Sequence, residues 1–165
     1  MTPTEFNKCV DEHADSLFRY CVGLTGNQAD ADDLVQTAFR KLWENVNELD
    51  HKVAKSWLFR TAYRSMIDNY RKVKREREYR NRQVERSMEF ESSIEERDLV
   101  RKALEVLTEE QKNLILLRDY EGYSYQELCD LTGMSMPAVK TTLFRCRKKL
   151  KEKLLEMNFT KYKVK

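Results

Sequence analysis

The stretch SYQELCDLTGMSMPAVKTTLFRCRKKL, residues 124–150, contains two short amphipathic segments on either side of Gly133. Glycine suits the turn of a helical hairpin because it adopts a positive φ without steric strain. Pro137 falls in the first turn of the second segment, where its missing N–H would have had no helical partner. The pattern predicts two short helices joined by a tight turn, the second running into a basic stretch.

The second segment sorts its residues onto two faces. Its apolar residues recur at helical spacing and form one stripe to bury: Val139, Leu143, Cys146, Leu150 and Leu154. The residues off that stripe must point outward: Lys140, Thr141, Phe144, Arg145, Arg147, Lys148, Lys149 and Lys151. Such a face fits the DNA major groove, because Arg and Lys can donate to guanine or phosphate and an apolar group can touch a thymine methyl. The alternative is a small helical core with Phe144 packed beside a neighbour and a solvated basic face.

The composition indicates a helical protein. Among 165 residues there are only 4 Gly and 2 Pro, while 36% are charged. Sheets need turns and turns need Gly and Pro, so an all-α fold of two small domains is expected. We expect no signal peptide or membrane span, and therefore a cytoplasmic protein without membrane insertion.

No site for catalysis, metal or cofactor is predicted. The cysteines are Cys9, Cys21, Cys129 and Cys146. They show neither C-x-x-C spacing nor clustering with a histidine, so reduced, partly buried thiols are expected. No nucleophile and base pair or phosphate-binding glycine loop is present in the sequence, so an enzyme is disfavoured.

Charge is strongly segregated along the chain. Residues 1–50 hold ten acids and four bases, whereas residues 140–165 hold ten bases and two acids. Such a division predicts a polyanion as the partner of the basic end and a basic surface as the partner of the acidic end.

Capping signals divide the first half into three expected helices. The first begins after Thr2 and ends at Gly26, and the second begins after Asn27 and runs to about Val46. Residues 47–56 lack periodicity and are expected to form a loop, followed by a third helix from Ala54 or Ser56. Trp43 and Trp57 are expected in the core.

In the second half, Ser92 or Ser93, Thr108 and Ser124 each precede Glu or Gln by three residues, which predicts three capped helices. The second of these should run to about Glu121 and end at Gly122, and a fourth should start at Ser135. The expected organisation is a domain at 1–75, a flexible charged linker at 76–94, a domain at 95–157 and a basic tail at 158–165.

The second half resembles region 4 of bacterial sigma factors through its residues 123–128, 133–135, 139–141 and 143–150. The first half resembles region 2 through DADDLVQTAF at 30–39, Trp43, WLFR at 57–60 and IDNYR at 67–71. The chain has nothing domain-sized between these halves, so it resembles the extracytoplasmic-function (ECF) group, which keeps only these two regions. The resemblance implies a region 2 three-helix-type domain and a region 4 helix-turn-helix domain.

The resemblance implies a function in transcription initiation, with core RNA polymerase and promoter DNA as partners. Asp32, Asp33, Leu34, Val35 and Gln36 match the family's site for the clamp helices of the largest polymerase subunit. Region 4 would bind the flap of the second-largest subunit. An acidic helix start suits a basic partner, but it also stabilises the helix dipole, and both roles can hold together. The family also implies an anti-sigma factor that holds the protein inactive.

The resemblance also implies two DNA-contacting sets. The −10 element would be melted and its single strand held by Asn47, Lys52, Lys55, Arg60, Arg64, Arg71 and Lys72. Lining of this single-strand groove is the alternative to a core position for Trp43 and Trp57. The −35 duplex would be read, within the helix-turn-helix at 124–143 and just beyond it, by Ser135, Lys140, Thr141, Phe144, Arg145 and Lys148. The rival function is a stand-alone helix-turn-helix regulator, which would leave the DDLVQ and WLFR segments without a role.

Overall fold

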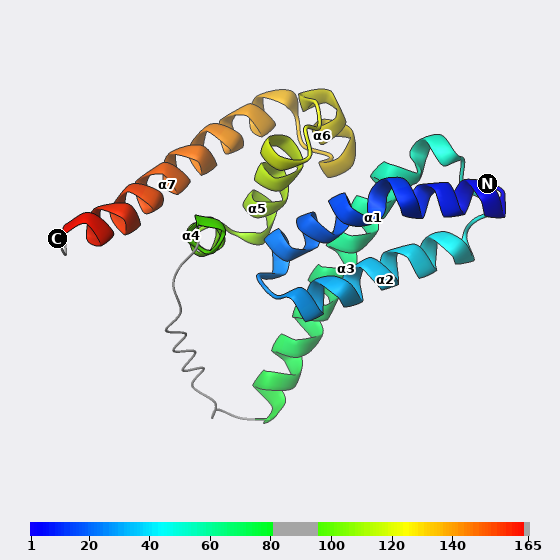
Figure 1. Ribbon diagram of the computed structural model, residues 1–165, viewed down its shortest axis with the longest axis horizontal. Coiled ribbons are helices and arrows are strands. Elements are labelled where there is room, and N and C mark those ends of the chain that lie inside the picture. Colours follow the sequence, from blue (N-terminus) through cyan, green and yellow to red (C-terminus); the bar gives the residue numbers. More distant parts are fainter. Residues whose placement is uncertain (81–95, 164–165) are drawn as a thin grey trace.

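The computed structural model describes the backbone of residues 1–80 and 96–163, with side chains described for 1–76 and 99–157. Every regular element in these ranges is a helix, which confirms the all-α prediction (Figure 1). The elements are α1 (Pro3–Thr25), α2 (Gln28–Glu44), α3 (His51–Arg80), α4 (Glu96–Leu104), α5 (Glu109–Ile115), the π-helix η1 (Leu116–Tyr120), α6 (Tyr125–Thr132) and α7 (Met136–Lys163). Within the described parts, no helix is both long and apolar enough to cross a bilayer.

Capping signals correctly predicted both ends of α1 and the start of α2, whereas α2 ends at Glu44, before the predicted end at about Val46. The Thr2 hydroxyl accepts from the Glu5 amide at 3.2 Å, and the Glu5 carboxylate accepts from the Thr2 amide at 2.7 Å. Gly26 closes α1 with φ +68°, and the Asn27 side chain then caps α2 by accepting from the Asp30 amide. These bonds satisfy backbone groups that a helix end otherwise leaves without partners.

The predicted loop at 47–56 is too long, because α3 begins at His51. The Asp50 carboxylate accepts from the Lys52 amide at 2.9 Å and satisfies one of the free amides at the helix start. Ala54 is fully buried in the core, so packing favours a helical turn that propensity alone does not reveal. Lys52 and Lys55 are therefore helical residues.

The helices α1, α2 and α3 pack on one another as the N-terminal domain (Figure 1). Its largest fully buried side chains come from all three helices: Leu17, Tyr20, Leu24, Leu42, Leu58 and Phe59. The core prediction for Trp43 is wrong, since this side chain is 49% exposed and packs edge-on against Phe6 at the rim. Trp57 is partly buried against the core.

The helices α4 to α7 form the C-terminal domain, with α7 packing on α4, α5 and α6. The predicted capping boxes at Thr108 and Ser124 are both present. The helix predicted to run to Glu121 is α-helical only as far as Ile115, and its last part is the π-helix η1. Gly122 follows with φ +73°. The caps proposed at Ser92 and Ser93 lie outside the described residues.

The two domains touch through the end of α1, which packs on α5 and η1. Buried residues of both domains form one continuous hydrophobic cluster. α3 continues to Arg80 and so extends into the segment predicted as a linker, whose remainder, 81–94, lies outside the described residues. The free thiols of Cys9, Cys21 and Cys146 are buried and that of Cys129 is partly buried, as expected.

Candidate polymerase and promoter interfaces

The helix-turn-helix predicted around Gly133 is present. α6 ends at Gly133, whose φ is +75°, and α7 starts three residues later. Leu128, Val139, Leu143 and Cys146 are buried, and Leu150 is partly buried against the core, so the predicted stripe faces inward as far as Leu150. Leu154 is only partly buried. Burial of this stripe fixes the rotation of α7 and with it the identity of the outward face.

The outward face of α7 is open to solvent. Lys140, Thr141, Arg145 and Lys148 are all exposed, and the Phe144 side chain is 70% exposed. An exposed ring bordered by Arg145 and Lys140 combines an apolar contact with two cationic donors, which is the chemistry that base edges and phosphates require. The helical core with a packed Phe144, the alternative considered above, is wrong.

Ser135 has a structural task in addition to its predicted DNA contact. It precedes α7, and its Oγ accepts a hydrogen bond from the Ala138 amide at 3.3 Å. Such a bond is typical of an N-cap. The side chain is exposed, so capping does not bury it.

Arg147 does not belong to the free positive surface on which the sequence placed it. Its Nη2 and Nε donate to the two carboxylate oxygens of Asp119, at 2.6 and 3.1 Å. This bidentate bond is the main reason why the pKa of Arg147 is raised. Because 28 positions separate the two residues, no local sequence signal indicated the pair. It joins η1 to α7 and supports the helix that carries the outward face.

The ring of Tyr125 holds two further cations near the turn. The Arg118 guanidinium lies 4.2 Å and the Lys140 ammonium 5.5 Å from its centroid. Cation–π attraction therefore helps to orient Lys140, one of the predicted −35 contacts, before any DNA is bound.

The acidic start of α2 presents most of the predicted polymerase contacts on its surface. Asp32, Asp33 and Gln36 are exposed, and Val35 is partly buried. Leu34 is only 3% exposed and packs in the core, so the chain does not present this side chain on the surface of α2. Its burial anchors α2 on its neighbours and turns the two carboxylates outward.

The predicted −10 contacts are distributed along α3 and the turn before it. Asn47, Lys52, Arg64, Arg71 and Lys72 are exposed. Two residues of the set contact the C-terminal domain. Arg60 is partly buried, and its Nη2 donates to the Asp130 carbonyl at 3.4 Å; Lys55 is exposed, and its Nζ lies 5.0 Å from the Tyr123 ring centroid. In this arrangement the set is divided between solvent and the domain contact.

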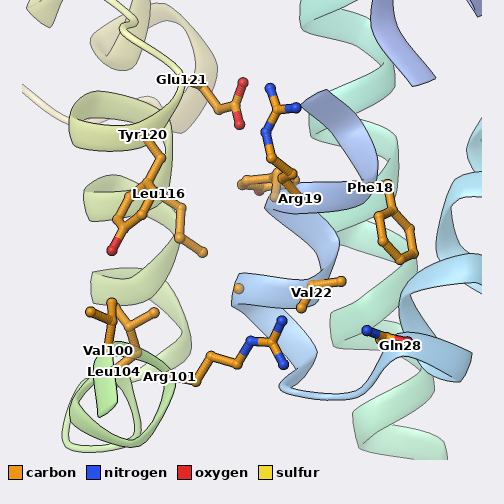
Figure 2. Close-up of a pocket in the computed structure, with 12 residues that line it drawn as sticks. Phe18, Arg19, Val22, Gln28, Val100, Arg101, Leu104, Leu116, Tyr120 and Glu121 are labelled. Carbon is orange, nitrogen blue, oxygen red and sulfur yellow. The ribbon is translucent and has the colours of Figure 1, made fainter. Parts of the chain in front are cut away.

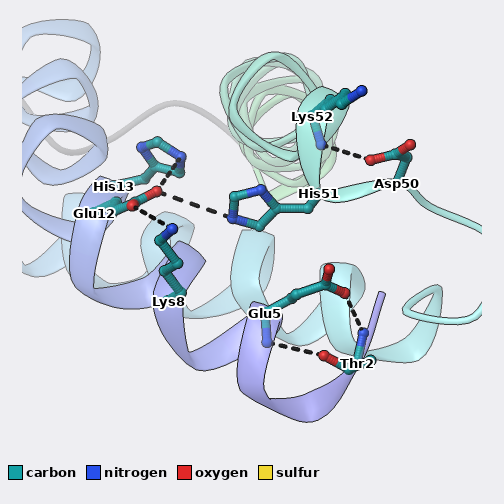
Figure 3. Close-up of polar contacts among 8 residues, drawn as sticks. All are labelled: Thr2, Glu5, Lys8, Glu12, His13, Asp50, His51 and Lys52. Atoms are coloured by element: carbon teal, nitrogen blue, oxygen red, sulfur yellow. Dashed lines mark hydrogen bonds and ion pairs between the residues drawn. The ribbon is translucent and has the colours of Figure 1, made fainter.

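The sequence analysis did not predict a polar cluster between the first half of α1 and the start of α3 (Figure 3). Glu12 lies between both histidines, with Oε2 3.9 Å from His13 Nε2 and 4.0 Å from His51 Nε2. Burial lowers the pKa of His13, which favours its neutral form. The side chains in the described ranges provide no group of three or more His, Cys, Asp or Glu that could hold a metal ion. Through Glu12 and His51, the cluster joins α1 to the start of α3.

Both halves of the chain match family models. Residues 9–76 match sigma-70 region 2, and residues 97–150 match sigma-70 region 4. The two matches coincide with the N-terminal domain and with the helix-turn-helix domain.

Curated relatives match over nearly the full chain. The RNA polymerase sigma factor SigV of Bacillus subtilis is 30% identical over 148 residues, which cover 88% of this chain and 89% of the relative. The RNA polymerase sigma-E factor of Streptomyces antibioticus is 32% identical, with 91% and 84% covered. The ECF RNA polymerase sigma factor SigL of Mycobacterium tuberculosis H37Rv is 30% identical, with 92% and 89% covered.

Solved structures agree on the fold. One is the sigma factor RpoE in complex with the anti-sigma factor NepR from Bartonella quintana, with TM-score 0.75, 23% identity, and 90% of this chain and 96% of that chain covered. Another is CnrH in complex with the cytosolic domain of CnrY, with TM-score 0.67, 25% identity, and coverage of 92% and 88%. The chain belongs to the sigma-70 family and, within it, to the ECF RNA polymerase sigma factors.

Proposed function

We propose that this sigma factor binds core RNA polymerase through its N-terminal domain and directs it to promoters whose −35 element it reads as duplex and whose −10 element it reads as single strand. The observation that carries the proposal is the outward face of α7, where Phe144 is exposed beside Lys140 and Arg145. An apolar ring costs free energy in water, and a thymine methyl in the major groove offers it a partner.

The polymerase contacts rest on charge complementarity. Asp32 and Asp33 are exposed on α2 and would meet the clamp helices of the largest subunit, while the C-terminal domain would bind the flap of the second-largest subunit. The −10 strand would follow the exposed cations of α3, including Arg64 and Arg71. Because its partner is core polymerase, the protein would act in the cytoplasm.

An anti-sigma factor is proposed as the inhibitory partner. One of the solved structures described above is the sigma factor RpoE in complex with the anti-sigma factor NepR, and it shares the fold of this chain. The proposal therefore rests on likeness of fold, and co-purification from the source cell would identify the partner.

Run-off transcription with purified core polymerase on genomic fragments tests the proposal. We expect discrete start sites that appear only when the protein is added, with shared sequence elements upstream of them. A stand-alone helix-turn-helix regulator would bind duplex DNA without core enzyme and produce no new start sites. That result would overturn the proposed function.

A further inference from the structure

Arg147 lies on the outward side of α7 by its position, yet its side chain is bonded to a neighbouring helix. It follows Lys140 by seven residues and Phe144 by three, and these spacings place all three on one side of the helix. Its guanidinium nevertheless binds Asp119 of η1, with Nη2 2.6 Å from Oδ1 and Nε 3.1 Å from Oδ2. A cation on the side of α7 proposed to face DNA is therefore held by an acid of the same chain.

The π-helix η1 fixes the position of this acid. Leu116 and Leu117 are buried, and the Glu121 amide donates to the Leu116 carbonyl at 3.0 Å. Figure 2 shows Leu116, Tyr120 and Glu121 beside an open groove of about 590 Å³ between η1 and α1. Asp119 of the same turn bonds to α7 instead. π-helical turns are rare and frequently occur at functional positions, which directs attention to the residue that this one holds against α7.

Further cations lie beside Arg147. The Tyr125 ring has the Arg118 guanidinium 4.2 Å and the Lys140 ammonium 5.5 Å from its centroid. A hydrogen bond from Arg147 is the main reason why the pKa of the Tyr125 hydroxyl is lowered. Tyr125 thus brings three cations to one place, where they attract anions, and Asp119 supplies the carboxylate that Arg147 binds.

A carboxylate that uses both oxygens presents an arginine with the same geometry as a phosphate. Guanidinium groups bind either anion through two parallel N–H···O bonds. The pair is also accessible, since 45% of the Arg147 side chain and 37% of the Asp119 side chain are exposed. Ion pairs open to water contribute little net free energy, so a polyanion that reaches α7 can compete for the guanidinium.

We propose that Asp119 competes with a phosphate of the DNA backbone for Arg147 and so limits the sequence-independent affinity of the C-terminal domain for duplex DNA. A phosphate must displace Asp119 before it gains Arg147, so this contact adds less affinity than an unpaired arginine would. The base contacts proposed for Phe144 and Arg145 then make up a larger share of the binding, and base contacts are the ones that distinguish sequences. The inference rests on the proposed function in so far as α7 binds the −35 duplex.

A double-mutant cycle in the full chain tests the competition. Asp119→Asn keeps the shape of the side chain but replaces one acceptor by a donor, so the bidentate bond cannot form. Asp119→Ser is measured in parallel, and both substitutions are repeated in the Arg147→Ala background. Glu152→Gln is the matched control, because it removes one negative charge from an exposed position of α7.

The measurement is the affinity for a short fluorescent DNA duplex of random sequence at several salt concentrations. We expect Asp119→Asn and Asp119→Ser to tighten binding several-fold and to steepen the slope of log K against log salt by about 0.9, the contribution of one further phosphate contact. In the Arg147→Ala background, neither substitution should change the affinity more than Glu152→Gln does. Far-UV circular dichroism checks that helix content is kept.

The inference is overturned if both Asp119 variants keep or lose affinity at an unchanged salt slope, because the pair would then be only structural. It is also overturned if the gain is equal in the two backgrounds, since lower repulsion between position 119 and DNA would explain that result. Failure of the proposed function is a separate outcome. It would appear as absence of core-dependent start sites, whereas the duplex measurement contains no polymerase.

Discussion

The two faces proposed to bind DNA use the same chemistry but differ in availability. On α7 the predicted −35 contacts, including Phe144 and Arg145, are all exposed. On α3, Arg60 is partly buried and bonds to the C-terminal domain, and Lys55 contacts that domain while it stays exposed, whereas Arg64, Arg71 and Lys72 are exposed. A basic helix is therefore not by itself an available surface, because a neighbouring domain can occupy part of it.

The largest effect should come from a pair of adjacent residues on α7 with opposite environments. Leu143 is 1% exposed, so Leu143→Ala should lower the free energy of unfolding by about 2–5 kcal/mol. Phe144→Ala should change it by less than about 0.5 kcal/mol while weakening duplex binding. Urea denaturation and duplex titration separate the two variants. Equal losses of stability would contradict the assignment of inward and outward faces.

Arg145→Ala sharpens the comparison on the open face. If this guanidinium contacts a base, binding to a promoter duplex found by run-off transcription should weaken by about 1–3 kcal/mol. Binding of the variant to a duplex with the same composition and a scrambled −35 element should weaken much less. Lys148→Ala serves as the control, because loss of a phosphate contact weakens both duplexes alike. Equal loss on both duplexes for Arg145→Ala would refute base readout.

Asp33→Lys tests the acidic face of the N-terminal domain. Reversal of an exposed charge should weaken association with core polymerase by about 1 kcal/mol, or roughly fivefold in Kd. Glu44→Lys reverses an exposed charge at the other end of the same helix and should have little effect. Titration of fluorescent protein with core enzyme measures both. The same Kd for the two variants would argue against a contact at the helix start.

The smallest effect concerns pH, and it should be confined to the N-terminal domain, which holds both histidines of the chain. Burial lowers the pKa of His13 in the folded chain, with smaller contributions in the same direction from Lys55 and His51 and an opposing one from Glu12. Below about pH 6.5, the unfolded chain therefore binds more protons than the folded chain, and stability falls as pH decreases.

His13→Gln should remove the part of the stability loss at low pH that comes from protonation of His13 in the unfolded chain. The check is the difference in Tm between about pH 7.5 and about pH 5.5, which should be smaller in the variant than in the unmodified chain. An unchanged difference would show that His13 does not contribute to it.

Local signals predicted much of the secondary structure. The boundaries at Thr2, Gly26, Thr108 and Gly133 were predictable because each depends on a bond or a φ angle formed within a few residues. The start of α3 was not, because the burial of Ala54 in a three-helix core stabilises its first turn. The burial of Leu34 was not predictable for the same reason, because it depends on how α2 packs against the neighbouring helices.

The sequence by itself determined the two domains, their helical hairpins and the outward face of α7, because capping, hydrophobic period and turn chemistry act over short distances. Only the tertiary structure decided which cations are available. Arg147 pairs with Asp119 from 28 positions away, and Arg60 meets Asp130 from 70. Such contacts depend on how separate helices pack, so no pattern within one helix predicts them. Position 23 shows the same dependence, since a Cβ atom there would lie 2.6 Å from Cδ2 of Leu116 in another helix.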